Sequence, residues 1–345
     1  MKKKEKSQKP KNIYERLIRK GHVNNPDTVP IIYNKENNMG FYGIEKMHHF
    51  DTKKFQGIQK ALKKGKFYEN GQHAVKTREV SEDILKKIHS QDYLNSLQKS
   101  SKVAEILEMW VFAAIPNFLI QKHALKPMRY HVAGTIVAPY FAAKRGWAIC
   151  LGGGMHHASS EEGGGWCVYS DIPLSIKIAK EQGLIKKAMI IDLDAHQGNG
   201  LGRDKLNHHI GEQEDIYIID FYNEYAYPGD TEAKRGINID IGINGKTTND
   251  QYLTLLEQAL DEASNDFQPD MIFYNAGTDI LDGDPLGGLH ISEETCMARD
   301  HLVFKYAFDR KIPIVMTTSG GYQLTNASLI ARSILQMKDM LNFKL

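Results

Sequence analysis

The sequence predicts a single-domain α/β fold, with a central parallel β-sheet flanked by helices on both faces and a functional site at the carboxyl ends of the strands. Short apolar runs rich in β-branched residues recur along the chain, and each suits a strand buried on both faces. Amphipathic stretches lie between these runs, and such alternation is typical of layered α/β folds. In chain order, the expected strands are residues 29–33, 148–151, 188–191, 216–219, 271–274 and 314–316. The expected helices are residues 81–98, 172–181, 250–264 and 296–309.

Length and composition indicate one large globular domain. The chain has 345 residues, of which 41% are hydrophobic and 25% charged, so it can bury a sizeable core. The sequence contains no linker rich in Pro, Gly or Ser. Residues 1–20 carry nine Lys or Arg against two Glu, whereas the whole chain has a net charge of only +2. We therefore expect residues 1–20 to form a basic, flexible segment and residues 21–345 to form the folded domain.

Membrane insertion, specific nucleic-acid binding and disulfide bonding are not expected. The chain has neither an apolar leader nor a run of ~18 consecutive apolar residues. No aromatic residue interleaves with the basic residues between Lys2 and Lys11, which favours a solvated leader over a nucleic-acid contact. Cys150, Cys167 and Cys296 are odd in number and far apart, so we expect them to be core residues. These features predict a cytoplasmic protein, or a nuclear one in a eukaryote.

Polar or glycine-rich segments directly follow four of the expected strands. Leu151 leads into Gly-Gly-Gly-Met-His-His, and Ile191 leads into Asp-Leu-Asp-Ala-His. Tyr274 leads into Asn-Ala-Gly-Thr-Asp, and Met316 leads into Thr-Thr-Ser-Gly-Gly-Tyr. Open parallel sheets bind ligands outside the carboxyl ends of their strands. We therefore expect the four segments to converge on one crevice.

The second of these segments has the spacing of metal ligands. Asp192, Asp194 and His196 are two residues apart, so an extended segment turns all three side chains toward one side. Asp279, at the end of another strand, offers a further carboxylate. Asp194, His196 and Asp279 then form a three-ligand set with an open coordination position, as a catalytic metal site requires. The competing interpretation is a turn with solvated carboxylates, and the position of Asp279 argues against it.

Two further motifs suit amide hydrolysis. His156 and His157 follow a strand and a glycine run, where adjacent histidines could divide the proton transfers of a metal-activated water. The histidine pairs at residues 48–49 and 208–209 lack this position and are expected to be surface or packing residues. Tyr322 follows a glycine pair, and its hydroxyl could hydrogen-bond the oxyanion that forms when water attacks an amide. An ordinary half-buried tyrosine is the alternative.

Taken together and in order, these segments resemble the histone deacetylase family, most closely its class IV branch. The likeness runs from about Val29 to near the C-terminus. Its most specific segments are residues 39–48, 152–160, 163–167, 190–200, 274–281 and 318–323. The resemblance implies the arginase/deacetylase α/β fold, with the active site at the carboxyl strand ends. It also implies zinc-dependent hydrolysis of Nε-acyl-lysine amides.

The resemblance assigns the metal sites. Asp194, His196 and Asp279 correspond to the ligands of one Zn²⁺ per chain. Family members also hold K⁺ through the main chain of the same segment, which implicates Asp192, Asp194 and His196. Fe(II) remains an alternative to zinc, because ligand type alone discriminates poorly between these metals.

The resemblance also assigns the proton-transfer groups. His156 and His157 correspond to the tandem histidines of the family, Asp192 to the residue that orients His156, and Tyr322 to the residue that polarises the carbonyl. Asn199 stands where the class I enzymes have an Asp beside the second histidine, and class IV members share this Asn. Because an amide stabilises an imidazolium less than a carboxylate does, the pKa of His157 should be lower than with an Asp partner.

The resemblance implies an acyl-lysine tunnel walled by Trp166 and Tyr227, with Gly165 and Leu286 also in contact with the substrate. The family more often has Phe at the place of Trp166. This departure leaves the width of the tunnel open.

Several alternatives remain at this point. The acyl group could be acetyl or a long fatty chain, and an acetylated polyamine could replace the acyl-lysine of a protein or peptide. A binuclear arginase-type enzyme is disfavoured because Gly198 and Gly277 occupy the places of the additional carboxylates. A non-catalytic acyl-lysine scaffold is disfavoured by the complete set of ligands and by Tyr322.

Overall fold

The computed structural model describes residues 12–40, 51–341 and 343. Three features singled out above fall wholly or mostly outside these ranges. They are the basic leader as far as residue 11, residues 41–48 of the early family-like segment, and the histidine pair at residues 48–49.

The centre of the fold is one eight-stranded sheet in the order β2-β1-β3-β8-β7-β4-β5-β6, and every neighbouring pair is parallel. The strands are β1 Thr28–Ile32, β2 His73–Val75, β3 Trp147–Cys150, β4 Ala188–Asp192, β5 Ile216–Asn223, β6 Ile239–Ile243, β7 Met271–Asn275 and β8 Ile314–Thr317. All six expected strands are present, which confirms the α/β prediction. The two missed strands, β2 and β6, form the edges of the sheet, where burial is less complete.

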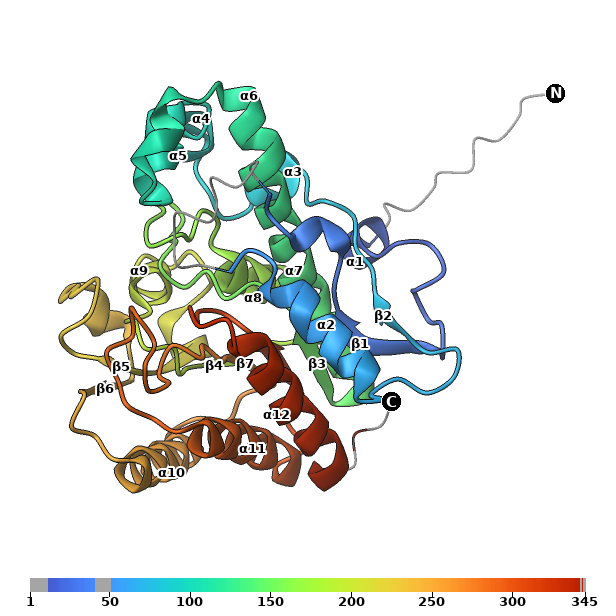
Figure 1. The fold of residues 1–345 in the computed structure, drawn as a ribbon, viewed down its shortest axis with the longest axis vertical. Coiled ribbons are helices and arrows are strands. Elements are labelled where there is room, and N and C mark those ends of the chain that lie inside the picture. Colours follow the sequence, from blue (N-terminus) through green and yellow to red (C-terminus); the bar gives the residue numbers. More distant parts are fainter. Residues whose placement is uncertain (1–11, 41–50, 342, 344–345) are drawn as a thin grey trace.

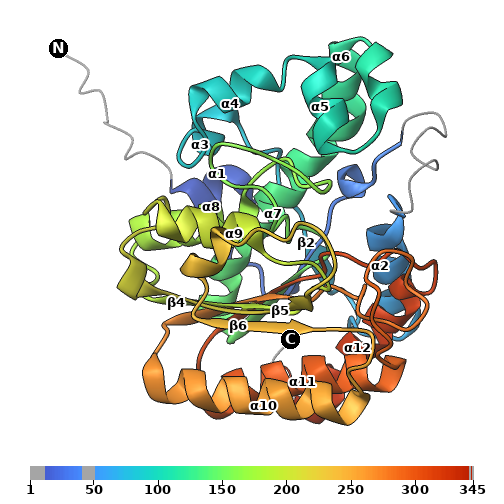
Figure 2. The same cartoon turned by 90° about the vertical axis from the view of Figure 1, so that its left-hand side faces the viewer.

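The helices cover both faces of the sheet, as expected (Figure 2). Helices α2 Lys54–Lys64, α10 Asn249–Asp266, α11 Glu293–Asp309 and α12 Asn326–Leu341 pack on one face. Helices α7 Lys126–Arg145, α8 Asp171–Glu181 and α9 Asn199–Leu206 pack on the other. Successive side chains of a strand point to opposite faces of the sheet. Ile190 therefore packs in the core with α7, α8 and α9, whereas Met189 and Ile191 pack in the core with α2, α10, α11 and α12. Two-sided burial explains why the strands read as continuous apolar runs.

Shorter helices gather beyond the layer of α7, α8 and α9, at the top of Figure 1. They are α3 Glu82–Leu85, α4 Gln91–Ser96, α5 Ser100–Ile106 and α6 Asn117–Ile120. The single helix expected over residues 81–98 is therefore wrong. Ser90 divides it, because its extended backbone and its side chain, which accepts a hydrogen bond from the backbone N–H of Tyr93, start a new helix.

Folded structure begins earlier than the expected domain boundary at residue 21. Helix α1, Ile13–Leu17, buries Ile13, Tyr14 and Leu17 in the core beside α7. Three apolar residues four or fewer positions apart supply the apolar side of this short helix, and they were overlooked among the basic residues around them.

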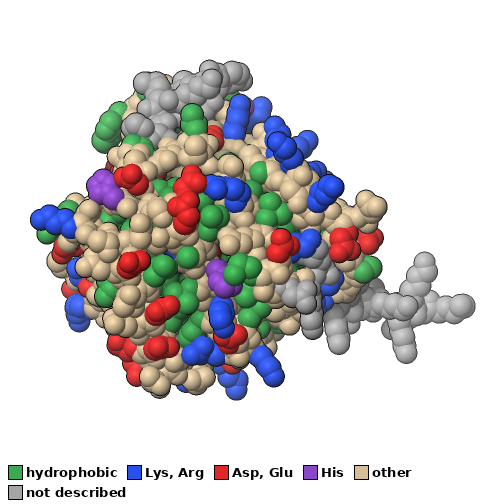
Figure 3. Space-filling view, turned by 60° about the horizontal axis from the view of Figure 1, so that its bottom comes forward, with side chains coloured by type: hydrophobic (Ala, Val, Ile, Leu, Met, Phe, Trp, Pro, Cys, Tyr) green, Lys and Arg blue, Asp and Glu red, His purple; other side chains and the backbone are tan. Residues whose placement is uncertain are grey.

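Helix α7 is the longest helix that sequence reasoning missed. It is buried on nearly all sides and contains Gly134 and Pro139, so it shows no amphipathic period. The other three expected helices match α8, α10 and α11 to within a few residues. On the outer face of the layer with α10 to α12, acidic and basic side chains are intermixed with apolar ones (Figure 3).

Two smaller expectations can also be compared with the structure. Cys150, Cys167 and Cys296 are buried and form no disulfide. Within the described ranges, no helix has both the length and the apolar character needed to cross a membrane.

The topology brings the four polar strand ends together. Strands β3, β8, β7 and β4 are consecutive neighbours in the sheet. Each is followed by one of the four segments singled out in the sequence, and parallel pairing places all four carboxyl ends at one edge.

Candidate active site

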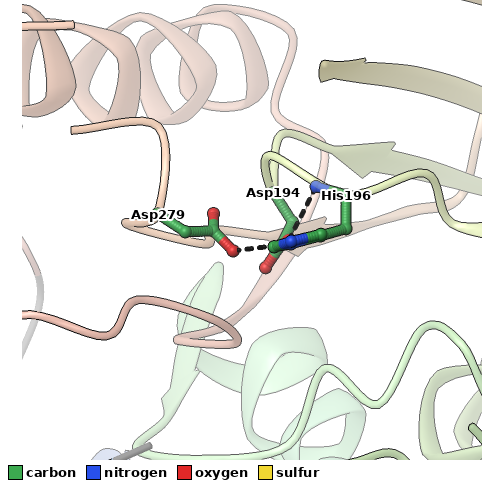
Figure 4. A group of neighbouring side chains, drawn as sticks. All are labelled: Asp194, His196 and Asp279. Carbon is green, nitrogen blue, oxygen red and sulfur yellow. Dashed lines mark hydrogen bonds and ion pairs between the residues drawn. The ribbon is translucent and has the colours of Figure 1, made fainter. Parts of the chain in front are cut away.

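The candidate metal centre consists of Asp194, His196 and Asp279, whose side chains point toward one another (Figure 4). Among the described residues, these three form a cluster in which one ligand atom from each lies within 4.8 Å of the others. The Nδ1 atom of His196 lies 3.1 Å from Oδ1 of Asp194 and 3.0 Å from Oδ2 of Asp279. Asp194 and His196 come from the segment after β4, and Asp279 from the segment after β7.

The donor set fits a divalent cation. All three side chains are buried, and two carboxylates so close together in a dry site require a positive charge between them. Burial raises the pKa of Asp279 to about 7, and the Asp194 carboxylate adds to this rise. Burial opposes the charge of His196, yet hydrogen bonds to Asp194 and Asp279 raise its pKa to about 11. Two carboxylates and one imidazole suit Zn²⁺, and leave a coordination position for substrate.

Hydrogen bonds from the neighbouring segments fix the carboxylates in place. The hydroxyl of Ser319 and the N–H of Gly320 both donate to Oδ2 of Asp194, each at 3.0 Å. The N–H of Ala195 donates to Oδ1 of Asp279 at 2.8 Å. A Cβ on Gly320 would lie 2.4 Å from Oδ2 of Asp279, so only glycine allows this approach. The segments after β4, β7 and β8 therefore hold one another.

The tandem histidines have different partners. Nδ1 of His156 donates to Oδ2 of Asp192 at 2.8 Å, and Nδ1 of His157 donates to Oδ1 of Asn199 at 2.8 Å. Burial lowers the pKa of His156, but the charges of Asp192, Asp194 and Asp220 together with the hydrogen bond to Asp192 outweigh it and raise this pKa to about 9. Burial and the neighbouring His156 hold the pKa of His157 well below its usual value. Because Asn199 presents a carbonyl oxygen, neutral His157 carries its proton on Nδ1 and has a free lone pair on Nε2.

Tyr322 lines the same cavity as His156, His157 and Asp194. Its backbone N–H donates to Oδ2 of Asp284 at 2.9 Å, which fixes the chain after the glycine pair. Burial, with added repulsion from nearby carboxylates, raises the pKa of the phenol well above its usual value. Tyr322 is therefore a neutral hydrogen-bond donor at physiological pH.

The four expected tunnel residues are not equally placed. Gly165 and Trp166 line the cavity, and both have a left-handed backbone, with φ of +50° and +64°. A φ above zero is rare for a bulky side chain and marks a constrained position. Tyr227 packs edge-on against the ring of His157, with centroids 4.9 Å apart, and is 47% exposed. Leu286 is 38% exposed, and neither Leu286 nor Tyr227 is among the described residues that line the cavity.

The apolar part of the cavity lining was missed by sequence reasoning. Its walls include Met39, Phe55, Met128 and Met155, which are apolar and largely buried. These residues come from four separate parts of the chain. No pattern in the sequence indicates that they meet, because their contacts depend on the packing of α2 and α7 against the sheet.

Two buried charged residues near the site were also missed. The Nζ atom of Lys54 donates to the carbonyl oxygens of Ser319 and Gly320, at 2.6 and 2.8 Å. Asp220 is fully buried beside Asp192 in the sheet, and burial together with the charge of Asp192 holds its pKa well above its usual value. Asp220 directly follows an expected strand, so the rule of polar strand ends could have found it. Lys54 lies within a run of basic residues and gives no such signal.

The additional carboxylates that a binuclear site needs do not fit at residues 198 and 277. A Cβ on Gly277 would lie 2.2 Å from Oδ2 of Asp194, and a Cβ on Gly198 would lie 2.7 Å from Oδ2 of Asp192. Carboxylates at these positions are therefore incompatible with the present geometry, which argues against a binuclear site. The pair at residues 208–209 lies away from the metal centre: His208 is exposed, and His209 bonds Asp204 at 3.2 Å.

Comparisons with known proteins agree with this description of an α/β protein with a buried candidate metal centre. A histone deacetylase domain matches residues 48–337. Histone deacetylase 2 of Arabidopsis thaliana is 47% identical over 306 residues, which cover 89% of this chain and 78% of that protein. Histone deacetylase HDAC1 of Drosophila melanogaster is 25% identical over 261 residues, covering 71% of this chain and 48% of that protein.

A solved structure shows the same fold. The crystal structure of the HDA15 HD domain superposes with a TM-score of 0.72 at 19% identity, over 92% of this chain and 89% of that one. On the domain match and the identity to the Arabidopsis protein, this chain belongs to the histone deacetylase family, which comprises hydrolases of acetylated lysine.

Proposed function

We propose that this protein hydrolyses the amide bond of Nε-acyl-lysine in a zinc-dependent reaction. The observation that supports this most directly is the arrangement of one cavity. Its lining includes the tandem histidines, Tyr322 and Asp194, and Asp194 belongs to the buried cluster with His196 and Asp279. Membership of the histone deacetylase family supports the same reaction.

In the proposed mechanism, Asp194, His196 and Asp279 would hold Zn²⁺, which would act there as a Lewis acid toward water and the amide carbonyl. Nε2 of His157 accepts a proton as water attacks the carbonyl carbon, because its Nδ1 proton is held by Asn199. The hydroxyl of Tyr322 donates to the oxyanion of the tetrahedral intermediate. The C–N bond then breaks, the histidine pair returns a proton to the lysine nitrogen, and the products are a carboxylic acid and a lysine amine.

We further propose that the substrate range includes acyl chains longer than acetyl. The apolar lining residues Met39, Phe55, Met128 and Met155 support this proposal, because an apolar wall can take up methylene groups that a polar wall would exclude. The partner Asn199 of His157 and the overall sequence likeness support placement in the class IV branch. Acetylated polyamines are the alternative substrate.

A series of lysine peptides that differ only in the acyl group tests both proposals. Full-length protein reconstituted with Zn²⁺ is given acetyl-, octanoyl- and myristoyl-lysine peptides, with and without a chelator. Formation of the deacylated peptide is measured by mass spectrometry. We expect chelator-sensitive release, with kcat/KM for octanoyl or myristoyl at least equal to that for acetyl. Faster release of acetyl alone contradicts the longer-chain proposal. Release from acetylated polyamines but from no peptide contradicts the acyl-lysine proposal.

We also propose that K⁺ binds behind the metal centre, next to Asp192. Asp220 supports this site, because its Oδ1 atom is buried without a hydrogen-bond partner while its Oδ2 accepts the N–H of Gly198 at 2.9 Å. A buried carboxylate oxygen with no donor is costly unless a cation neutralises it. Asp220 thus extends the K⁺ ligand set beyond the Asp192, Asp194 and His196 segment.

Thermal unfolding in different salts tests this K⁺ site. Replacing tetramethylammonium with K⁺ at constant ionic strength should raise the Tm of the wild-type protein by about 1–4 °C, because K⁺ binds only the folded state. The Asp220→Asn variant should lose most of this increment, since it loses the charge that favours the ion. Asp215→Asn changes a partly exposed aspartate directly before β5; it is the control and should keep the increment. An equal K⁺ effect in the wild type and in Asp220→Asn would remove Asp220 from the site.

A further inference from the structure

A buried arginine lies behind the two segments that carry the metal ligands. Arg299, on helix α11, has a relative exposure of 0%. Its Nη1 donates to the carbonyl oxygen of Leu193 at 3.1 Å and to that of Gly277 at 2.6 Å. Leu193 directly precedes Asp194, and Gly277 lies two residues before Asp279. One nitrogen thus joins the β4 segment to the β7 segment.

These two carbonyls lie where the sheet stops holding the segments together. The register between β4 and β7 ends at the pair Asp192 and Asn275, and the N–H of Leu193 still donates to the carbonyl of Asn275 at 3.0 Å. Past this point the buried carbonyls of Leu193 and Gly277 need other donors. The guanidinium of Arg299 supplies both.

The guanidinium is itself held in place by Asp300. Nε and Nη2 of Arg299 both donate to Oδ1 of Asp300, at 3.1 and 2.8 Å. Asp300 also accepts the hydroxyl of Tyr274 from β7 at 2.5 Å and that of Ser333 from α12 at 2.6 Å. The guanidinium group of arginine is planar and always charged. Its two hydrogen bonds to Asp300 therefore fix its orientation. The position of Nη1 is therefore fixed relative to the sheet and to two helices.

We infer that Arg299 is a positioning residue that sets the separation of the two metal-ligand segments and thereby the affinity of the site for its metal. The inference rests on the proposed metal-dependent function. Arg299 is not one of the described residues that line the substrate cavity, so it acts through Leu193 and Gly277 and not on the substrate. A purely structural arginine would stabilise the fold without changing metal affinity, and this difference can be measured.

The test is the Zn²⁺ affinity of full-length Arg299→Met and Arg299→Lys, measured by competition with a chromophoric chelator on metal-stripped protein. Changes in groups that orient metal ligands typically weaken metal binding by about 10–100-fold, and we expect a loss of this size in Arg299→Met. Arg299→Lys should recover part of it, because lysine keeps the charge but has a flexible ammonium in place of the fork. With saturating Zn²⁺, kcat should fall while KM changes little.

Arg129→Met is the matched control. Arg129 is a partly buried arginine on α7 that donates to Glu79 at 2.7 Å and to Gln121 at 3.2 Å. It contacts neither Leu193 nor Gly277 in the hydrogen bonds found among the described residues. Its loss should lower Tm and leave Zn²⁺ affinity within about threefold of the wild type, as expected for a residue that does not orient a ligand.

The outcomes separate this inference from the proposed function. A wild-type protein that binds no divalent metal would overturn the metal site and the role of Arg299 with it. Wild-type Zn²⁺ binding with the same affinity in Arg299→Lys would overturn the role of Arg299 alone, and this variant decides if Arg299→Met does not fold. Weaker binding in both the Arg299 and Arg129 variants would show a general effect of stability and would also overturn the inference.

Discussion

Replacing Asp194 with Ala is expected to abolish metal binding and amide hydrolysis together. In the proposed site, Asp194 is one of three protein ligands, and two ligands would hold a catalytic zinc poorly. Because a bound catalytic metal typically contributes several kcal/mol of transition-state stabilisation, we expect kcat/KM to fall by at least about 10³-fold. Asp279→Ala should behave in the same way. Metal content by elemental analysis and peptide deacylation at saturating Zn²⁺ measure the two effects.

The control for these variants is Asp282→Ala. Asp282 lies three residues after Asp279, but its side chain is 71% exposed and pairs only with the exposed His290 among the described residues. Its loss should leave metal content and activity unchanged. Full activity with bound metal in Asp194→Ala or Asp279→Ala would show that the ligand assignment is wrong.

Replacing Tyr322 with Phe should lower kcat by about 10²–10³-fold while metal content stays at the wild-type level, which is the usual effect of losing one oxyanion donor. The phenol is neutral, since burial raises its pKa, and it lines the cavity beside the tandem histidines. Because Tyr322 is not one of the three proposed ligands, Zn²⁺ affinity should change little. Single-turnover rates with an acyl-lysine peptide measure the chemical step directly.

Tyr225→Phe serves as the matched control, because Tyr225 is 81% exposed. It should turn over at the wild-type rate. Wild-type turnover in Tyr322→Phe as well would remove Tyr322 from the mechanism. A loss of metal in that variant would instead assign Tyr322 a role in holding the site.

The sequence predicted the centre of the fold well because the strands are buried on both faces. Continuous apolar runs followed by polar residues mark such strands and their carboxyl ends, and this pattern located Asp194, His196 and Asp279 without a structure. It could also have located Asp220. By contrast, the edge strands β2 and β6 are short or half exposed, so they lack a continuous apolar run. Helix α7 is buried on nearly all sides, so its sequence lacks the amphipathic repeat of a surface helix.

The residues that support the site were not predictable from the sequence. Lys54 and Arg299 donate hydrogen bonds to backbone carbonyls that lie more than 100 residues away in the sequence, except for the bond from Arg299 to Gly277. Local sequence patterns do not indicate such contacts. The tunnel residue Leu286 was placed by resemblance, and the structure leaves it outside the cavity lining. The cellular location and the absence of specific nucleic-acid binding stay predictions.

The strand order has a consequence for how the protein reaches its native state. Strand β8 is the last strand of the chain, yet it lies between β3 and β7 near the middle of the sheet. During synthesis, the part with β1 to β3 and the part with β4 to β7 have no shared strand until β8 leaves the ribosome. Strands that are far apart in the sequence pair slowly, and until β8 has paired, the edges of β3 and β7 stay without a partner strand. Nascent chains that stop before Ile314 should therefore depend on chaperones and lack the catalytic site.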